Sequence, residues 1–192
     1  MAASAAPYGA KPIGTLSASG SFTGKVQHIK IASGYDTLIS WGDFVKLVAA
    51  GTIEKDAGTT TATPVGVFMG CSYTDPTTSQ PTYAQMWTAD VAASDAMAYV
   101  LTDPNILFQM QGDGAITQAM LGSNFAIVVT AGSTTIGRSK NAVDQSTSNT
   151  TNTLPLRIVD YVDGPDSAVG DAYTDVIMKC NVGHQYVNTT GI

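Results

Sequence analysis

Apolar and polar residues alternate with a period of two along much of the chain, and this pattern predicts β-strands. In residues 26–31, Ile29 and Ile31 point to one side, whereas His28 and Lys30 point to the other. Continuous apolar runs such as residues 96–101 predict strands that are buried on both faces. The strands predicted from these two patterns are residues 26–31, 43–48, 52–54, 63–71, 83–87, 96–101, 106–111, 125–129, 156–162 and 175–182.

Two of the connections carry signals of their own. Residues 102–105, Thr-Asp-Pro-Asn, are typical of a turn, so the strands at residues 96–101 and 106–111 are expected to pair as a hairpin. Within another predicted strand, Gly66 and Gly70 indicate a β-bulge or a close approach of two backbones.

One short helix is expected between Asp113, which can cap its start, and Gly122, which can end it. Ile116 and Met120 would share one face of this helix. Residues 131–153 are rich in Ser, Thr and Asn and are expected to form a loop. The predicted fold is therefore mostly β: a small antiparallel β barrel or sandwich with one short helix.

The first 24 residues differ from the rest of the chain in composition. They contain many Gly, Pro, Ala and Ser residues and few large apolar ones, which predicts an extended N-terminal arm over residues 1–24. Tyr8 and Ile13 are the apolar side chains that could anchor this arm on a neighbouring subunit; an unstructured tail is the alternative. The rest of the chain is expected to form a β domain, undivided or with two lobes: residues 25–192, or residues 25–72 and 73–192.

Charged residues make up only 12% of the chain, about half of the roughly 25% that is usual in soluble domains. Neutral polar residues must therefore supply much of the surface, and neutral groups cost less to desolvate than ions. Interfaces between proteins are likewise poor in Lys, Glu and Asp. This composition favours an assembly subunit, with a secreted β-protein as the alternative.

The charge balance bears on the partners. The 15 acidic and 9 basic residues give a net charge of −6. Such a chain lacks the main electrostatic contribution to DNA binding, so nucleic acid is not an expected partner. No stretch approaches the roughly 20 apolar residues of a membrane-spanning helix, and no secretory signal is recognisable at the N-terminus. No membrane partner is expected, and the chain fits a protein assembled in a bacterial cytoplasm.

Residues suited to catalysis or metal binding are sparse. The two histidines, His28 and His184, are expected at the surface, and no pairing of His or Cys has the spacing of a zinc site. Glu54 is the only glutamate, which excludes a Glu-based acid–base pair but not one built from two aspartates. No catalytic residue, cofactor or metal ligand is assigned, and the chain is predicted not to be an enzyme.

Cys71 and Cys180 fall in separate predicted strands and are expected to be free, buried thiols. Aspartates also gather around a Gly/Pro turn near the end of the chain. Hard cations bind oxygen-rich loops, but the spacing does not match an EF-hand, so a solvated acidic loop is expected and cation binding is the alternative. These aspartates are Asp160, Asp163, Asp166, Asp171 and Asp175.

Aromatic side chains are candidates for contacts with other chains. Residues 72–95 are rich in Thr, Ser and Pro and predict a long exposed excursion that carries Tyr83 and Trp87. A large aromatic side chain in such a segment suits contact with another chain, and Trp87 is the strongest candidate. Together with Tyr8 and Ile13, these two residues form the predicted set of subunit contacts.

Two short patterns occur close together: Gly42, Asp43, Val45 and Leu47 around one predicted strand, and residues 64–67, Pro-Val-Gly-Val, in the strand that brings the chain back. Together they resemble the small β domain of capsid-decoration proteins of tailed phages. The resemblance implies a β domain with an N-terminal arm, bound at local three-fold axes of the capsid, often as a trimer, without catalytic residues. The long part of the chain after Cys71 exceeds the minimal domain of that family, which leaves the number of lobes and the symmetry open. Later segments that resemble tailed-phage virion proteins in style are residues 101–114, 154–164 and 175–192.

The function expected from this resemblance is to decorate and stabilise the outer surface of a tailed-phage capsid by bridging capsomers. The expected partners are the major capsid protein and copies of the chain itself, as a homotrimer on the outside of the virion. A head–tail connector or tail structural protein is one alternative, which ring symmetry other than three-fold would favour. The other alternative is a carbohydrate-binding surface β-protein, in which Trp87 and Tyr83 would stack on sugar rings.

Overall fold

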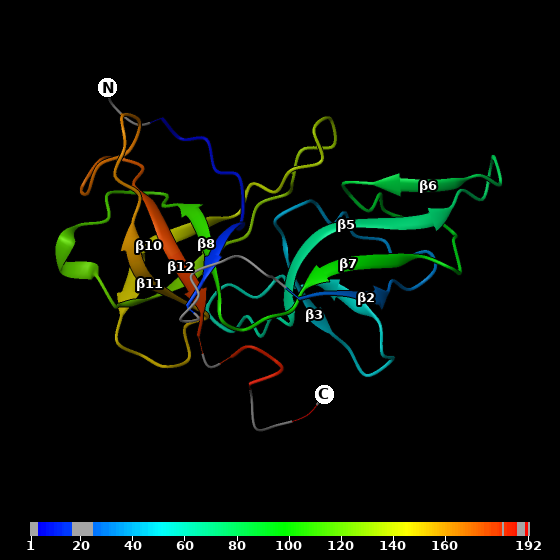
Figure 1. Ribbon diagram of the computed structural model, residues 1–192, viewed down its shortest axis with the longest axis horizontal. Helices are drawn as coiled ribbons and strands as arrows, with labels where there is room; N and C mark the ends of the chain where they lie inside the picture. Colours follow the sequence, from blue (N-terminus) through cyan, green and yellow to red (C-terminus); the bar gives the residue numbers. More distant parts are fainter. Residues whose placement is uncertain (1–3, 17–24, 182, 188–190, 192) are drawn as a thin grey trace.

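The computed structural model describes residues 4–16, 25–181, 183–187 and 191. The chain forms two antiparallel six-stranded sheets, and the single helical element in the described residues is one 3₁₀ turn. The sheets form two lobes that lie side by side along the longest axis of the molecule (Figure 1). The predicted class, a mostly β fold with a short helical element, is confirmed.

The C-terminal lobe is built on a curled sheet. In sheet order its strands are β1 (Lys11–Thr15), β8 (Ile106–Gln111), β12 (Asp175–Cys180), β11 (Leu156–Tyr161), β9 (Asn124–Val128) and β10 (Ala142–Asn149). A parallel bridge between Gly112 and Val143 brings β10 next to the end of β8. Buried and outward-facing residues alternate, as in β12, where Val176, Met178 and Cys180 are buried.

The N-terminal lobe has the same design on a smaller scale. Its strands, in sheet order, are β2 (Val26–Lys30), β7 (Met97–Leu101), β5 (Gly66–Thr74), β3 (Phe44–Leu47) and β4 (Ile53–Lys55), and β6 (Pro81–Ala84) pairs with the end of β5. A parallel bridge between Ile31 and Ile53 curls this sheet as well. The strand–turn–strand predicted for residues 43–54 is confirmed, because β3 and β4 pair antiparallel.

Both glycines singled out in β5 have the predicted roles. A Cβ atom on Gly66 would collide with the backbone carbonyl of Leu101, so only glycine allows β5 and β7 to pair at this point. The register between the same two strands shifts between Phe68 and Gly70, and Gly70 has a φ of 139°. Such a backbone conformation favours glycine.

The two lobes share an apolar interface. Each lobe has its own hydrophobic core, but Phe44, Val67 and Leu101, on strands of the N-terminal lobe, belong to the core of the C-terminal lobe. The rings of Phe44 and Phe108 meet edge to face with their centroids 6.0 Å apart. Successive residues of one strand thus serve different cores, since side chains alternate between the faces of a sheet.

A buried ion pair lies where the two lobes meet. The Asp43 carboxylate forms a 2.9 Å salt bridge with Lys55, whose side chain is only 8% exposed. It also accepts hydrogen bonds from the Ser139 hydroxyl (2.6 Å) and the Ser40 amide (2.9 Å). Because Ser139 lies between β9 and β10, Asp43 ties the N-terminal lobe to the C-terminal lobe.

The described part of the predicted N-terminal arm is extended and lies on its own chain. β1 pairs antiparallel with β8. Ahead of β1, the Gly9 amide donates to the Asn141 carbonyl (3.2 Å) and the Ala10 amide to the Gly42 carbonyl (2.9 Å). These bonds hold the segment at the junction of the two lobes. Residues 1–3 and 17–24 of the predicted arm lie outside the described residues.

The chain crosses between the lobes at residues 102–105. The predicted turn is present, and Asp103 accepts a 2.9 Å hydrogen bond from the Asn105 amide. The predicted hairpin is wrong: β7 pairs with β2 and β5, whereas β8 pairs with β1 and β12. An alternating pattern indicates which face of a strand is buried, but not which strands pair along its edges. The lobes therefore divide at this turn, and the division considered between residues 72 and 73 falls inside β5.

Helical structure within residues 113–122 is limited to the 3₁₀ turn Gln118–Met120. The Asp113 carboxylate does not cap a helix but accepts a 2.8 Å hydrogen bond from the backbone of β10. The Ile116 amide donates to the hydroxyl of Thr174 (3.2 Å). The Asp113 carboxylate and the Ile116 amide are thus bound to other segments of the chain, so neither is available for the hydrogen bonds of a longer helix.

The expected loop over residues 131–153 contains a strand, β10, which corrects that prediction. β10 pairs antiparallel with β9, with an irregular register between Asp144 and Asn149. Only Ala142 and Val143 are buried apolar residues in this strand. The other residues of β10 are polar, so the strand shows no alternation of apolar and polar residues in the sequence. An edge strand pairs on one side only and can form with few buried side chains.

We expect Asp43→Asn to lower the free energy of unfolding by about 3 kcal/mol, because the Lys55 ammonium would stay buried without a counter-charge. Chemical denaturation followed by circular dichroism measures this loss. The matched control is Asp43→Asn combined with Lys55→Met, which should be more stable than Asp43→Asn alone. A loss below about 0.5 kcal/mol, the range of ordinary surface substitutions, would contradict the role of this ion pair.

Candidate functional site

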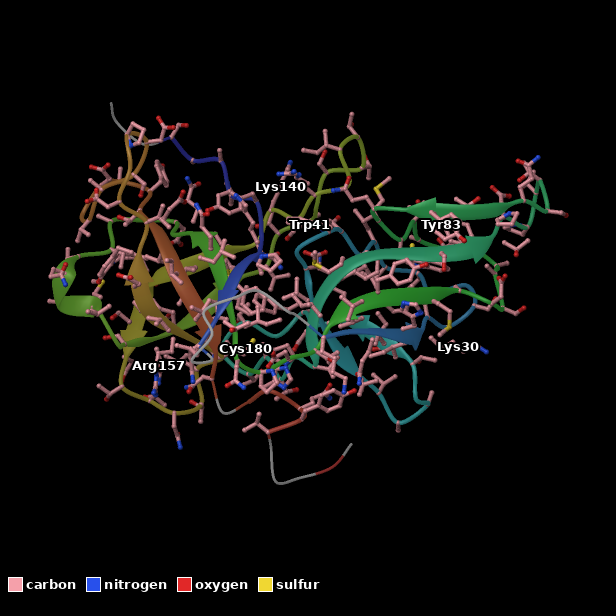
Figure 2. The ribbon with its side chains drawn as sticks, viewed as in Figure 1. Lys30, Trp41, Tyr83, Lys140, Arg157 and Cys180 are labelled. Carbon is pink, nitrogen blue, oxygen red and sulfur yellow. The ribbon has the colours of Figure 1, made fainter. Side chains whose placement is uncertain are left out.

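Tyr83 is an exposed aromatic side chain on β6. Its side chain is 77% exposed, and it lies opposite Ser72 where β6 pairs with the end of β5. Figure 2 shows it on the N-terminal lobe, on the side of the molecule away from Arg157. Tyr83 is therefore accessible to another molecule, and its contact with another chain stays a prediction.

A hollow of about 160 Å³ lies beside Tyr83. It is lined by Ser72, Tyr73, Thr74, Pro81, Thr82, Tyr83 and Asp95. The Asp95 carboxylate accepts hydrogen bonds from the hydroxyl (2.6 Å) and the amide (3.1 and 3.2 Å) of Thr74, and these bonds lower the pKa of Asp95. The surface around Tyr83 thus presents hydroxyl groups, aromatic rings and one carboxylate that is already hydrogen-bonded.

Trp87 is a core residue of the N-terminal lobe, contrary to the prediction that it contacts another chain. It is fully buried, and its indole NH donates a 3.1 Å hydrogen bond to the Tyr35 carbonyl. Its ring meets that of Tyr73 edge to face at 5.6 Å. An antiparallel bridge with Ile39 brings the polar segment around Trp87 onto the core. Tyr83 and Trp87 consequently do not form a shared platform for sugar rings.

Tyr8 and Ile13 lie on the docked N-terminal segment. Ile13 is 39% exposed on β1, at an edge of the sheet, and is accessible to a neighbouring chain. Tyr8 is half-buried against its own lobe, where burial and the negative charge of Asp175 raise its pKa. Tyr8 therefore contributes to the docking of its own segment, and an intersubunit role for Ile13 stays a prediction.

The buried thiols offer no nucleophile. Cys71 and Cys180 are free and buried, as predicted. Burial raises the pKa of both thiols to about 12, so both are protonated at neutral pH. Within the described ranges, no group of three or more His, Cys, Asp or Glu side chains is arranged to hold a metal ion. No helix in that part of the chain is long and apolar enough to cross a membrane.

His184 is buried, contrary to the surface position expected for it. It is 2% exposed, and burial lowers its pKa from 6.5 to about 4, partly opposed by the charge of Asp103. The next residue, Gln185, exchanges hydrogen bonds of 2.6 and 3.0 Å with the backbone of Leu47. Residues 183–187 thus follow the C-terminal lobe but dock on the N-terminal lobe, with the His184 imidazole neutral at pH 7.

Low pH should destabilise the folded protein through His184. Between about pH 6.5 and pH 4 the unfolded chain binds a proton at this residue and the folded chain does not, so the free energy of unfolding should fall by up to about 3 kcal/mol as the pH falls. Denaturation curves across this interval measure the slope, and His184→Gln should flatten it.

The matched control is His28→Gln, which changes the exposed histidine and should keep the wild-type slope. Burial raises the pKa of Asp56 and of Asp175, so these carboxyls act in the opposite direction, but they do so in all three proteins. If the free energy of unfolding had the same pH dependence in wild type and His184→Gln, the pKa of His184 would not be lowered in the folded protein.

Comparison with known proteins found no matching family model, no similar curated protein and no similar solved structure. The described residues expose two surfaces with candidate contact residues: the one around Tyr83 on the N-terminal lobe and the sheet edge that carries Ile13 on the C-terminal lobe.

Proposed function

We propose that the chain is a virion structural protein that decorates and stabilises the outer surface of a tailed-phage capsid by bridging neighbouring capsomers. The observation that carries this proposal is the surface formed by β5 and β6 around Tyr83. The lining of the hollow beside Tyr83 contains hydroxyl and aromatic groups, no Lys, Arg or Glu, and a single carboxylate, that of Asp95, which Thr74 already hydrogen-bonds. Hydroxyl and aromatic groups are desolvated at lower cost than ions, and tyrosine is enriched among the residues that dominate binding energy.

The residues that resemble capsid-decoration proteins lie together in the N-terminal lobe. Val45 on β3 is the cross-strand partner of Gly66 on β5, and both are buried. Asp43, just ahead of β3, forms the buried ion pair with Lys55. The resemblance thus rests on residues that shape one contiguous β lobe, which supports a decoration-type domain in this part of the chain.

Bridging would stabilise a shell by added burial of surface. Two capsomers joined by a bound copy must lose an additional interface before they separate. About 800 Å² buried on each partner is enough for a specific contact, and contacts made at several sites strengthen one another. The net charge of −6 suits the outer face of a capsid better than the face toward DNA.

The proposed partners are the major capsid protein and further copies of this chain, as a homotrimer. The proposed location is the outer capsid surface of the virion, after assembly in the host cytoplasm. The 12% of charged residues favours such contacts, because few ions have to be desolvated when large surfaces meet.

Adding the chain to purified tailed-phage capsids that were assembled without it should raise the temperature at which they release DNA. The reason is the additional interface that has to break before the capsomers separate. A DNA-binding dye present during a temperature ramp measures the release, and an unrelated acidic protein serves as the control. An unchanged rupture temperature at saturating protein would contradict the decoration role.

Tyr83→Ser should weaken binding to the same capsids about tenfold or more, the loss expected when an aromatic residue at the centre of an interface is truncated. Co-sedimentation with capsids measures the affinity. Because Tyr83 is exposed, the thermal unfolding of the free chain should not change. Leu121→Ser, which alters an exposed apolar side chain of the other lobe, is the matched control and should bind like wild type. Wild-type affinity of Tyr83→Ser would remove this surface from the contact.

A further inference from the structure

Two cations lie directly opposite each other on the outer face of the C-terminal lobe. Arg157 on β11 and Lys179 on β12 are cross-strand partners, which places their Cβ atoms about 5 Å apart. Like charges in this arrangement destabilise a sheet. The one ion pair formed among the described residues is that of Lys55 with Asp43, so neither cation has a carboxylate partner in this part of the chain. An added anion would relieve their repulsion.

Arg157 is held in position by a buried amide. Its Nε donates a 2.8 Å hydrogen bond to the side-chain oxygen of Asn124, and the Asn124 amide group donates in turn to the Thr151 carbonyl (2.9 Å). Asn124 is fully buried, so the orientation of the guanidinium group is fixed from below. Among the described residues, no hydrogen bond engages the two terminal NH₂ groups of Arg157, and arginine binds a carboxylate through two parallel hydrogen bonds. A preoriented side chain also loses less entropy on binding.

A hollow of about 390 Å³ lies at this pair of cations. Asn105 and Asn181 add amide groups to its lining, and Val187 from the docked C-terminal segment adds an apolar edge. The volume lies within the range of roughly 300–1,000 Å³ that is usual for small-ligand sites. Figure 2 shows Arg157 and Cys180, which also lines the hollow, on the same lower side of the C-terminal lobe. The hollow therefore has the size and the charge to receive carboxylate side chains.

An acidic turn lies at the other end of the same pair of strands. Between β11 and β12, Gly164 and Ser167 exchange backbone hydrogen bonds of 2.9 and 3.3 Å and form a tight turn. The Ser167 hydroxyl oxygen accepts a 2.9 Å bond from the first amide of β12, which fixes the turn on the sheet. Asp163 and Asp166 are both exposed, and neither is part of an ion pair among the described residues. The turn thus presents two carboxylates on a rigid support.

We propose that the Arg157–Lys179 hollow binds the acidic turn, residues 163–166, of a second copy of this chain. The chemistry on the two sides is complementary: two cations in a hollow and two carboxylates on a projecting turn, none of which forms an ion pair within the part of the chain that the structure describes. The inference deepens the proposed self-association by naming the surfaces that make it, and in that respect it rests on the proposed function.

The position of the two surfaces requires that the contact joins different copies. At about 3.3 Å per residue, the part of β11 from Arg157 to Tyr161 alone separates them by about 13 Å. In Figure 1 the loop after β11 lies at the upper end of the C-terminal lobe, whereas Arg157 lies at the lower end in Figure 2. A hollow at one end and a turn at the other give a head-to-tail contact, which closes into a ring when the rotation between copies allows it. A ring of three copies would be the proposed homotrimer.

The test is a charge exchange between the two surfaces, followed by analytical ultracentrifugation. The basic-end variant is Arg157→Glu/Lys179→Glu, and the acidic-turn variant is Asp163→Lys/Asp166→Lys. Each alone should raise the dissociation constant of self-association about tenfold or more, because like charges then face each other. An equimolar mixture of the two variants should associate again, as alternating chains or as rings with an even number of copies, because only unlike variants then carry complementary charges.

Two controls separate this contact from general repulsion. Lys25→Glu/Lys30→Glu changes the net charge by the same amount as the basic-end variant, at exposed positions of the other lobe, and should associate like wild type. About 1 M salt, which shortens the Debye length to about 3 Å, should dissociate the wild-type assembly. Circular dichroism and thermal unfolding establish that each variant is folded.

Three results would overturn the proposal: a monomeric wild-type chain at low salt, equal weakening by the control variant, or failure of the mixture to associate. The capsid experiment distinguishes this failure from failure of the decoration role. A monomeric chain that still raises the rupture temperature rejects the head-to-tail contact alone. A chain that associates as expected but leaves capsids unchanged rejects the decoration role alone.

Discussion

The arrangement of the molecule depends on a buried carboxylate at the junction of its lobes. Asp43 is fully buried, and an ion in such a place is tolerated only when its charge and its hydrogen bonds are satisfied. Lys55 supplies the opposite charge from the same lobe, and Ser139 supplies a hydrogen bond from the other lobe. Around this point Phe44 on β3, Val67 on β5 and Leu101 on β7 pack into the core of the C-terminal lobe. Apolar packing and the ion pair together set how the two sheets are placed.

Both ends of the described chain reinforce this junction. Gly9 and Ala10 bond to the backbone of both lobes before β1 begins. At the other end, Gln185 completes the hydrogen bonds of Leu47 on β3, although it follows the last strand of the C-terminal lobe. Burial of His184 between these contacts makes that docking sensitive to protons, since a buried imidazole resists charge. The lobes are thus joined through both terminal segments as well as through the turn between β7 and β8.

The two lobes expose different chemistry as a result. The N-terminal lobe presents hydroxyl and aromatic groups around Tyr83, which suits broad contact at low cost of desolvation. The C-terminal lobe presents a pair of cations at one end and a pair of carboxylates at the other, which suits oriented contact between like subunits. The proposed decoration of a capsid uses the first surface, and the proposed contact between copies uses the second.

The sequence by itself determined the β class and most strands, because a period of two in hydrophobicity follows directly from the geometry of a half-buried strand. It also indicated the roles of Gly66 and Gly70 and the free, buried cysteines. Only the tertiary structure decided that β7 and β8 belong to different sheets, because edge pairing leaves no periodic signal. Tertiary structure likewise decided the burial of Trp87 and the pairing of Arg157 with Lys179. These depend on which distant segments cover or adjoin a residue, and local sequence does not encode that.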